Sequence, residues 1–402
     1  MSNDAVIVDV VRTPSGRGKP GGALSTVHPA DLLAGVLGEL VARNDLDPAL
    51  VDDVIGGCVS QVGEQSYNIT RTALLSAGFP DSVPGTTIDR QCGSSQQAAT
   101  FAAQGVIAGA YDVVIACGVE SMSRVPLGSS LGQSAGQGEQ RPDPFGSLMH
   151  ERYPKGLVNQ GVSAELINQE WGLSRDELDA FAARSHQLAT AAADRGDFDR
   201  ELLAVTTPEG VVVTADETIR AGTTVESLAG LKPAFYSERD SHRFPDLDWQ
   251  ITPGNSSPLT DGASATLIMS ATRAEQLGLT PRARFHSFAV TGSDPLLMLT
   301  GVIPVTRRIL DRAGLSIDDL DAYEVNEAFA CVPLVWQREL GADLAKLNPR
   351  GGAIALGHAL GSSGTRLLGT LLGELEATGG RYGLQTMCEG GGMANATIIE
   401  RL

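Results

Sequence analysis

An internal duplication constrains the fold of this chain more than any other feature of its sequence. Residues 51–59 resemble residues 317–325, and Cys-Gly-Ser-Ser at 92–95 resembles Leu-Gly-Ser-Ser at 360–363. Residues 111–118 in turn resemble residues 382–389, so three weak matches occur in the same order in both parts of the chain. Matches that keep their order are typical of a repeated structural unit. We therefore expect two similar halves.

The apolar pattern within each half predicts an α/β class. Short β-branched runs, such as residues 6–11 and 113–115, alternate with patterns typical of helices. Strands that are apolar on both faces belong in a sheet that helices cover on both sides. A layered arrangement of helices and strands follows.

The segment between the halves has a different composition. Residues 128–146 are rich in Gly, Gln, Ser and Pro, which predicts a loop. A helix is predicted to begin at Ser174, where Ser174 and Glu177 form a capping box. We expect residues 125–250 to form an inserted lobe that covers a ligand, because long insertions on a rigid scaffold often carry binding.

Composition and charge exclude several classes of protein. With 402 residues, 42% of them hydrophobic, the chain can bury a large core in two or three domain-sized units. A net charge of −18 argues against a nucleic-acid groove or an anionic membrane surface as partner. No apolar stretch is long enough to span a bilayer. Five cysteines, an odd number, and a start without a basic and then an apolar region indicate free thiols in a reducing cytoplasm.

Cys92 is the first candidate for a reacting group. A strand is predicted to end and a helix to begin at this residue, which places the thiol near free backbone N–H groups and the positive end of a helix dipole. Both effects lower a thiol pKa and stabilise an acyl-enzyme oxyanion. The alternative is that Cys92 is a small buried side chain, as most isolated cysteines are.

Three further polar positions stand in glycine-rich or strand-end contexts. His358 lies in a glycine-rich stretch, residues 351–361, where the backbone can approach other groups closely. Cys388 precedes three consecutive glycines whose N–H groups can bind an anion. Asn326 follows a predicted strand. Each has a structural alternative: a hydrogen-bonded histidine in a turn, a plain glycine turn and a helix cap.

Taken together, these motifs resemble those of the thiolase family, in the same order and at similar distances. The resemblance extends from Val-Arg-Thr-Pro at 11–14 to the C-terminus. It implies the thiolase fold, which consists of duplicated βαβαβαββ halves in five αβαβα layers with an inserted loop domain. The implied division is an N-terminal half of residues 1–124 and 251–273, a loop domain of residues 125–250, and a C-terminal half of residues 274–402.

The resemblance also implies a mechanism. Cys92 would attack a 3-ketoacyl-CoA after His358 takes its proton, which gives an acyl-Cys92 enzyme and acetyl-CoA. Cys388 would be the second acid and base. One oxyanion hole would use the N–H groups of Cys92 and Gly390, and the other would use His358 and a water held by Asn326. CoA and acetyl-CoA are then substrates, and neither a metal nor a permanently bound cofactor is expected.

The contacts to CoA carry over from two stretches. Residues 219–235 resemble the nucleotide-binding stretch of the family, and residues 254–263 resemble its pantetheine loop. Each of the implied positions could equally be ordinary loop or core packing. They are Arg220, Ser227, Leu231, Phe235, Ser257, Ala328 and Phe329.

Asn159 bears on the substrate. It opens Asn-Gln-Gly, where short-chain acetoacetyl-CoA thiolases typically have His-Met-Gly. Losing that pair removes a wall of the short acyl pocket, so a medium, long or bulky acyl chain is expected, as in the β-oxidation of fatty acids or sterol side chains. A short-chain acetoacetyl-CoA thiolase is the alternative within the family.

Two alternatives lie outside thiolytic cleavage. One is a decarboxylating condensing enzyme, against which Cys388 argues because such enzymes typically pair the nucleophile with two histidines or with histidine and asparagine. The other is a non-catalytic lipid- or acyl-CoA-binding protein with a thiolase-like fold. The resemblance further implies a homodimer or homotetramer, and a β-oxidation enzyme is a candidate partner.

Overall fold

Strands and helices alternate along almost the whole chain. The computed structural model describes residues 4–131 and 143–402, so residues 132–142 of the expected loop lie outside it. The strands are β1 (Ala5–Arg12), β2 (Gly16–Arg17), β3 (Asp53–Gly57), β4 (Gly85–Ile88), β5 (Val113–Ser121), β6 (Val205–Thr206), β7 (Val212–Val213), β8 (Thr260–Ser270), β9 (Ala283–Gly292), β10 (Ala322–Val325), β11 (Tyr382–Glu389) and β12 (Met393–Arg401). The helices are α1 (Pro29–Ala42), α2 (Ile69–Ser76), α3 (Ser94–Ile107), α4 (Ser147–Arg152), α5 (Gln160–Glu170), α6 (Arg175–Asp194), α7 (Val225–Ala229), α8 (Glu238–Arg243), α9 (Ala271–Gln276), α10 (Val302–Ala313), α11 (Cys331–Leu340), α12 (Ala353–Leu356) and α13 (Ser363–Thr378).

The strand order repeats in the two parts of the chain. In the N-terminal part it is β1-β8-β5-β3-β4, and in the C-terminal part it is β9-β12-β11-β10. Directions repeat as well, since β5 pairs antiparallel with β8 and parallel with β3, as β11 does with β12 and β10. The segments that resemble one another in sequence form β3 and β10, β5 and β11, and the starts of α3 and α13. The predicted duplication is confirmed.

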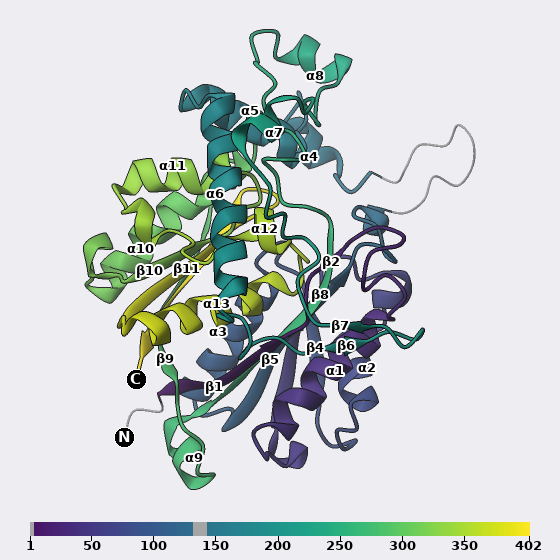
Figure 1. Cartoon of the computed structure of the whole chain (residues 1–402), viewed down its shortest axis with the longest axis vertical. Coiled ribbons are helices and arrows are strands. Elements are labelled where there is room, and N and C mark those ends of the chain that lie inside the picture. The colour runs from purple at the N-terminus through teal and green to yellow at the C-terminus, as the bar shows by residue number, and fades with distance from the viewer. Residues whose placement is uncertain (1–3, 132–142) are drawn as a thin grey trace.

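Five layers result from this repeat (Figure 1). On one face of the N-terminal strands, side chains of α1 and α2 pack against Val6 and Val8 of β1. On the opposite face, Ile7 and Val10 pack with α3 and α13, which also contact the C-terminal strands. Helices α10 and α11 cover the far face of those strands. Strands covered on both sides explain the continuous apolar runs in the sequence.

Close backbone contacts join the two halves. A Cβ atom on Gly118 would lie 2.0 Å from the carbonyl oxygen of Gly361, and one on Gly364 would lie 2.0 Å from the backbone N of Gln96. Only glycine fits at these two positions. They bring the loop before α13 against the start of α3, and therefore bring His358 into the neighbourhood of Cys92.

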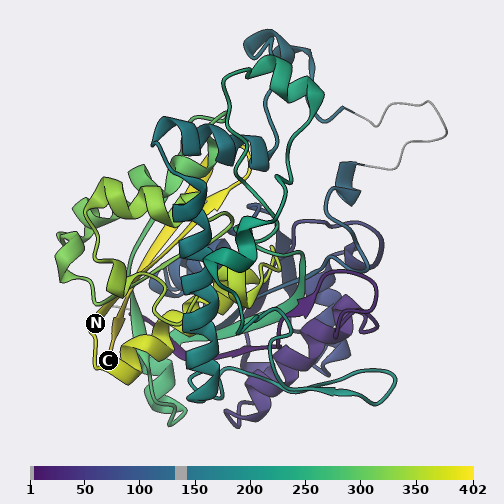
Figure 2. The ribbon, with the colours of Figure 1, turned by 45° about the horizontal axis from the view of Figure 1, so that its top comes forward.

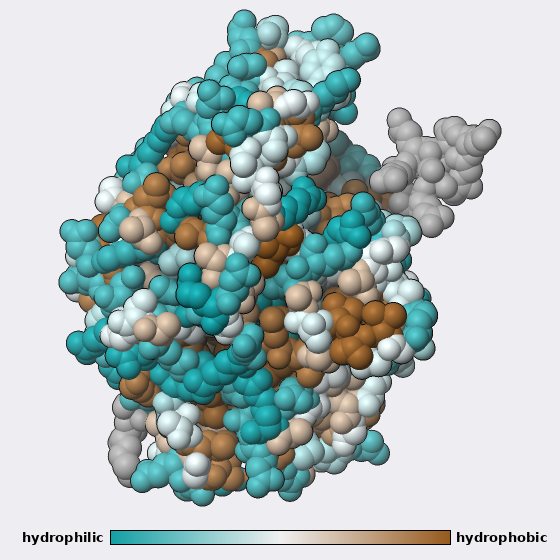
Figure 3. Space-filling model, viewed as in Figure 1, coloured by the Kyte–Doolittle hydropathy of each residue, from teal (hydrophilic) through white to brown (hydrophobic). Residues whose placement is uncertain are grey.

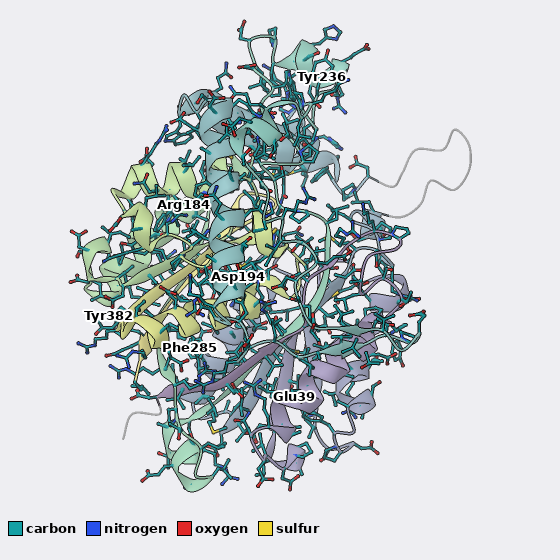
Figure 4. All side chains as sticks on the ribbon, viewed as in Figure 1. Glu39, Arg184, Asp194, Tyr236, Phe285 and Tyr382 are labelled. Atoms are coloured by element: carbon teal, nitrogen blue, oxygen red, sulfur yellow. The ribbon has the colours of Figure 1, made fainter. Side chains whose placement is uncertain are left out.

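The segment between the halves forms helices α4 to α8, drawn in teal in Figure 2. The predicted capping box is confirmed at the start of α6, where Ser174 and Glu177 each accept from the other's backbone N–H. Figure 4 shows Arg184 midway along this helix, and its guanidinium donates to the carbonyl oxygens of Leu344 and Leu347. These hydrogen bonds hold helix α6 against the C-terminal part of the chain.

The exterior is mixed in polarity. On the face drawn in Figure 3, hydrophilic side chains predominate and apolar side chains gather in separate groups. Across residues 4–131 and 143–402, none of the helices combines the length and apolar character needed to cross a membrane.

Candidate active site

A cavity of about 450 Å³ brings together residues from both halves and from the segment between them. Of the four predicted catalytic residues, Cys92 and His358 line it, whereas Cys388 and Asn326 do not. Five of the predicted binding positions line it as well: Asn159, Phe235, Ser257, Ala328 and Phe329. Phe235 and Phe329 meet edge to face with their ring centroids 5.7 Å apart. Reactive groups thus lie beside an apolar wall.

A tight turn presents Cys92 to the cavity. Gln91 adopts the left-handed conformation with φ of 49°, which is uncommon for a residue other than glycine. The Ser94 hydroxyl fixes this turn, since it donates to the Gln91 carbonyl oxygen at 2.6 Å and accepts from the Arg90 N–H at 2.9 Å. Helix α3 begins two residues after Cys92, with Gly93 as an N-cap that supplies no side-chain acceptor. The N–H groups of Gly93 and Ser94 donate to the carbonyl oxygens of Arg90 and Gln91, whereas across residues 4–131 and 143–402 the N–H of Cys92 has no backbone acceptor.

The pKa of Cys92 differs from the sequence-based expectation. Burial raises this pKa to about 12, Glu389 adds to the increase, and a hydrogen bond from the Gln160 side chain opposes it. Burial therefore outweighs the start of helix α3, and the thiol is protonated in the free protein at neutral pH. A base must remove its proton when it reacts.

His358 is held in one tautomer by its neighbours. Its Nδ1 lies 2.6 Å from the Ser363 Oγ, and the Ser363 hydroxyl donates to the Ala359 carbonyl oxygen at 2.9 Å. Since that hydroxyl has a single proton, Ser363 accepts from Nδ1–H, and Nε2 carries the lone pair. The Nε2 accepts from the Asn326 Nδ2 at 3.2 Å. Burial, with a contribution from Arg366, lowers the pKa of His358 to about 3, so the ring is neutral and suited to act as a base.

Cys388 is buried in β11 and, unlike Cys92, is not part of the cavity wall. Its pKa is raised well above the ordinary value, first by burial and next by Cys92, so the two thiols lie close enough to interact. Gly390 directly follows β11. Asn326 follows β10, and within residues 4–131 and 143–402 its buried Oδ1 has no hydrogen-bond partner. An acceptor of this kind can hold a water molecule.

Three of the positions predicted to bind CoA lie off the cavity wall. Arg220 is exposed, and Ser227 forms a capping box with Thr224 at the start of α7. Leu231 packs over the loop that leads to Ser257, since a Cβ on Gly254 would lie 2.6 Å from its Cδ1. The stretch that contains these residues therefore runs beside the cavity rather than through it.

Sequence reasoning missed several residues of the site. Gln91, Met122, Leu127, Gln160, Leu259 and Leu360 also line the cavity. Gln160 directly follows Asn159 in the Asn-Gln-Gly motif, whose departure from the usual His-Met-Gly could have indicated that Gln160 also belongs to the site. Ser363 lies five residues beyond His358 and carried no signal of its own, because its contact depends on how α13 begins.

Comparison with known protein families identifies the chain. The family model described as "Thiolase, N-terminal domain" matches residues 5–272, and "Thiolase, C-terminal domain" matches residues 279–401. The chain belongs to the thiolase family. It has the thiolase fold and is an acyltransferase, as the resemblance of its motifs predicted.

Relatives of this thiolase align along its whole length. It is 47% identical to "Steroid 3-ketoacyl-CoA thiolase FadA6" from Mycobacterium tuberculosis over 100% of this chain and 95% of the relative. It is 43% identical to a "3-ketoacyl-CoA thiolase" from Saccharophagus degradans over 99% of this chain and 98% of that relative. The crystal structure of the Bacillus anthracis acetyl-CoA acetyltransferase superposes with a TM-score of 0.89 at 38% identity, covering 100% of this chain and 99% of the other.

Proposed function

We propose that this thiolase uses CoA to cleave 3-ketoacyl-CoA into acetyl-CoA and an acyl-CoA two carbons shorter, and catalyses the reverse Claisen condensation. The observation that carries the proposal is the presence of Cys92 and a neutral His358 on the wall of one cavity. The names of the relatives, 3-ketoacyl-CoA thiolase and steroid 3-ketoacyl-CoA thiolase, support it.

The first half of the proposed reaction forms an acyl-enzyme. His358 Nε2 takes the proton of Cys92 as the sulfur attacks the 3-keto carbon. The bond between C2 and C3 then breaks, the acyl group stays on Cys92, and the Cys388 thiol gives its proton to C2 of the acetyl-CoA enolate. This half ends with a protonated His358 and a Cys388 thiolate.

The second half restores the enzyme. The Cys388 thiolate takes the proton of incoming CoA, and the CoA sulfur attacks the acyl-Cys92 thioester. Cys92 leaves and recovers its proton from His358. The two oxyanions would be stabilised by the N–H groups of Cys92 and Gly390 and by His358 with a water held at Asn326, each set contributing about 3 kcal/mol.

The acyl group is expected to be long or bulky. Asn159 and Gln160 stand where short-chain members typically carry His-Met, and the cavity wall there includes the apolar side chains of Met122, Leu127 and Leu259. The relative named for steroid substrates is 47% identical over the full chain. We infer that 3-ketoacyl-CoA esters of medium or long chains, or of ring-bearing acids, are the substrates.

A series of 3-ketoacyl-CoA esters tests both the activity and the acyl group. Burying one methylene contributes about 0.8 kcal/mol, so lengthening acetoacetyl-CoA by several methylenes should raise kcat/KM for CoA-dependent cleavage at least about tenfold. Ring-bearing esters belong in the same series. The rates are measured by loss of the 3-ketoacyl absorbance, with the Cys92→Ala protein as the blank.

Other outcomes select among the alternatives. A preference for acetoacetyl-CoA would show that the protein is a short-chain acetoacetyl-CoA thiolase. If no ester is cleaved while acyl-CoA still binds in calorimetry, the protein is a non-catalytic lipid or acyl-CoA carrier.

CoA would enter along the stretch beside the cavity. In this proposal Arg220 supplies a local cation for its phosphates, Ser227 and Leu231 contact the nucleotide, and Ser257 contacts pantetheine. The proximity of Leu231 to Gly254 supports this path, since it joins the two stretches into one surface. Phe235, Ala328 and Phe329 would line the tunnel that leads to Cys92.

We also propose a homo-oligomer. Strand β4 ends the described sheet, and helix α3, which contacts it, carries exposed apolar side chains. Tyr67 is 95% exposed, and Phe101 and Ile107 on α3 are 43% and 48% exposed. An open strand edge with apolar neighbours favours pairing with a second copy. Sedimentation equilibrium of the protein and of the Phe101→Lys variant measures the oligomeric state.

The division into domains and the location are proposals of the same kind. Strand β8 lies between β1 and β5, which supports grouping residues 251–273 with 1–124. Residues 125–250 would then be the loop domain and residues 274–402 the C-terminal half. All five cysteines are free and buried, which supports a reducing, cytoplasmic setting.

A further inference from the structure

Gln160 lies at the start of α5, where it faces the thiol of Cys92 from the segment between the halves. The first turn of this helix is fixed, because the Asn159 side chain accepts from the Val162 N–H at 3.0 Å. Gly161 adds a second constraint, since a Cβ there would lie 2.0 Å from the Phe235 ring. Gln160 itself lines the cavity with Cys92. Its side chain therefore projects from a rigid base.

The amide of Gln160 lies over Gly390. A Cβ placed on Gly390 would lie 3.2 Å from the Gln160 Nε2 and 3.2 Å from the Gln91 Oε1. Gln91 directly precedes Cys92 in the sequence. Gly390, which follows β11, lies next to the Gln91 side chain. The Gln160 amide thus lies among the residues that surround Cys92 in the cavity, close enough for its side chain to oppose the increase in the pKa of that thiol.

The Gln160 amide has no structural hydrogen-bond partner in the described part of the chain. Across residues 4–131 and 143–402, no hydrogen bond joins the Gln160 side chain to a nitrogen or oxygen atom of another residue, whereas Gln169 on the same helix donates to the Asp246 carbonyl at 3.2 Å. A buried, negatively charged sulfur needs donors, and the carboxyls of Glu389 and Glu120 oppose its formation. A neutral amide supplies a hydrogen-bond donor to the thiolate in addition to the backbone N–H groups.

We propose that Gln160 is a further catalytic residue, whose side-chain amide donates to the Cys92 sulfur and stabilises the thiolate. The inference rests on the proposed function, in which Cys92 is the nucleophile. The thiolate forms twice in each cycle, when His358 takes the proton and when CoA displaces Cys92 from the thioester. Gln160 moves no proton and keeps its own.

The test compares Gln160→Met with the unmodified protein by alkylation of Cys92 with iodoacetamide across pH, followed by mass spectrometry of the peptide. Methionine keeps an unbranched chain and removes the donor. A hydrogen bond to a charged group corresponds to about one pKa unit, and the thiol is protonated between pH 7 and pH 9, so the alkylation rate in this range should fall about tenfold. Gln169→Met is the matched control and should leave the rate unchanged.

The other groups that face Cys92 are the same in both proteins. They are Glu389 and Cys388 on β11, Glu120 on β5 and His358 after α12. The difference in alkylation rate therefore reports the Gln160 amide. Gln160→Asn, whose shorter amide does not span the same distance, should show the same decrease in rate, and thermal unfolding checks that both variants are folded.

The outcomes separate this inference from the proposed function. An unchanged alkylation rate between pH 7 and pH 9 in folded Gln160→Met and Gln160→Asn overturns the role of Gln160, even if 3-ketoacyl-CoA is cleaved. If no 3-ketoacyl-CoA is cleaved by the unmodified protein but the alkylation rate still falls in both variants, the proposed function fails and the contact between Gln160 and Cys92 stands. In the expected case kcat for cleavage also falls about tenfold in Gln160→Met, with KM little changed.

Discussion

Replacing Cys92 with alanine is expected to lower kcat for cleavage of 3-ketoacyl-CoA by about 10⁴-fold or more, because no acyl-enzyme can form. The cavity and its apolar wall remain, so binding of acyl-CoA should persist. Steady-state cleavage with saturating CoA measures the first effect, and calorimetry measures the second. In the unmodified protein, intact-mass spectrometry after mixing with substrate and no CoA should show one acyl adduct, located on Cys92.

Cys117→Ala is the matched control for this experiment. Cys117 is also a free, buried cysteine, but it lies within β5 and does not line the cavity. Its variant should keep the activity and the acyl adduct. Full cleavage by Cys92→Ala, or an adduct on Cys331 or Cys388 in the unmodified protein, would show that the nucleophile lies elsewhere.

The duplication and the layers were predictable because they depend on patterns within short segments. The apolar runs of β1 and β5 are continuous because helices cover both faces of the strands, and such runs can be recognised in the sequence. The capping box at Ser174 is likewise local, since its two residues are three positions apart. Cys92 and His358 were predictable through their glycine-rich contexts, and both lie on the cavity wall.

Contacts between distant segments were not predictable in the same way. The amide of Gln160 lies near Gly390 only because the start of α5 comes close to the turn after β11, and no periodicity in the sequence predicts that approach. The direction of the Cys92 pKa shift also depended on tertiary structure. The sequence indicated the start of a helix, which lowers a thiol pKa, whereas the depth of burial, which raises it, follows from the packing of Met387 and Leu367 around the thiol.

Replacing His358 with alanine should lower kcat by about 10³-fold, since the base that takes the Cys92 proton is lost. Ser363→Ala should have a smaller effect of about tenfold, because the ring remains but loses the acceptor that fixes Nδ1–H and frees Nε2. Ser362→Ala, one residue earlier, is the control and should keep kcat. Equal losses in Ser363→Ala and Ser362→Ala would mean that the hydroxyl supports the fold and not the tautomer.

The pH dependence of stability provides an independent check on the neutral state of His358. The pKa is about 3 in the folded protein and about 6.5 in an unfolded chain, so between these values only the unfolded chain binds the proton. The free energy of unfolding therefore decreases as the pH falls from 6.5 towards 3, and His358 contributes about 2 kcal/mol of that loss by pH 5. His358→Ala should lose correspondingly less stability between pH 7 and pH 5, whatever its stability at pH 7. Because a base must be neutral to accept a proton, the same shift keeps His358 active across this range. Urea unfolding of both proteins at the two pH values measures the difference, and equal losses would mean that folding does not lower the pKa of His358, so that the ring is charged at pH 5.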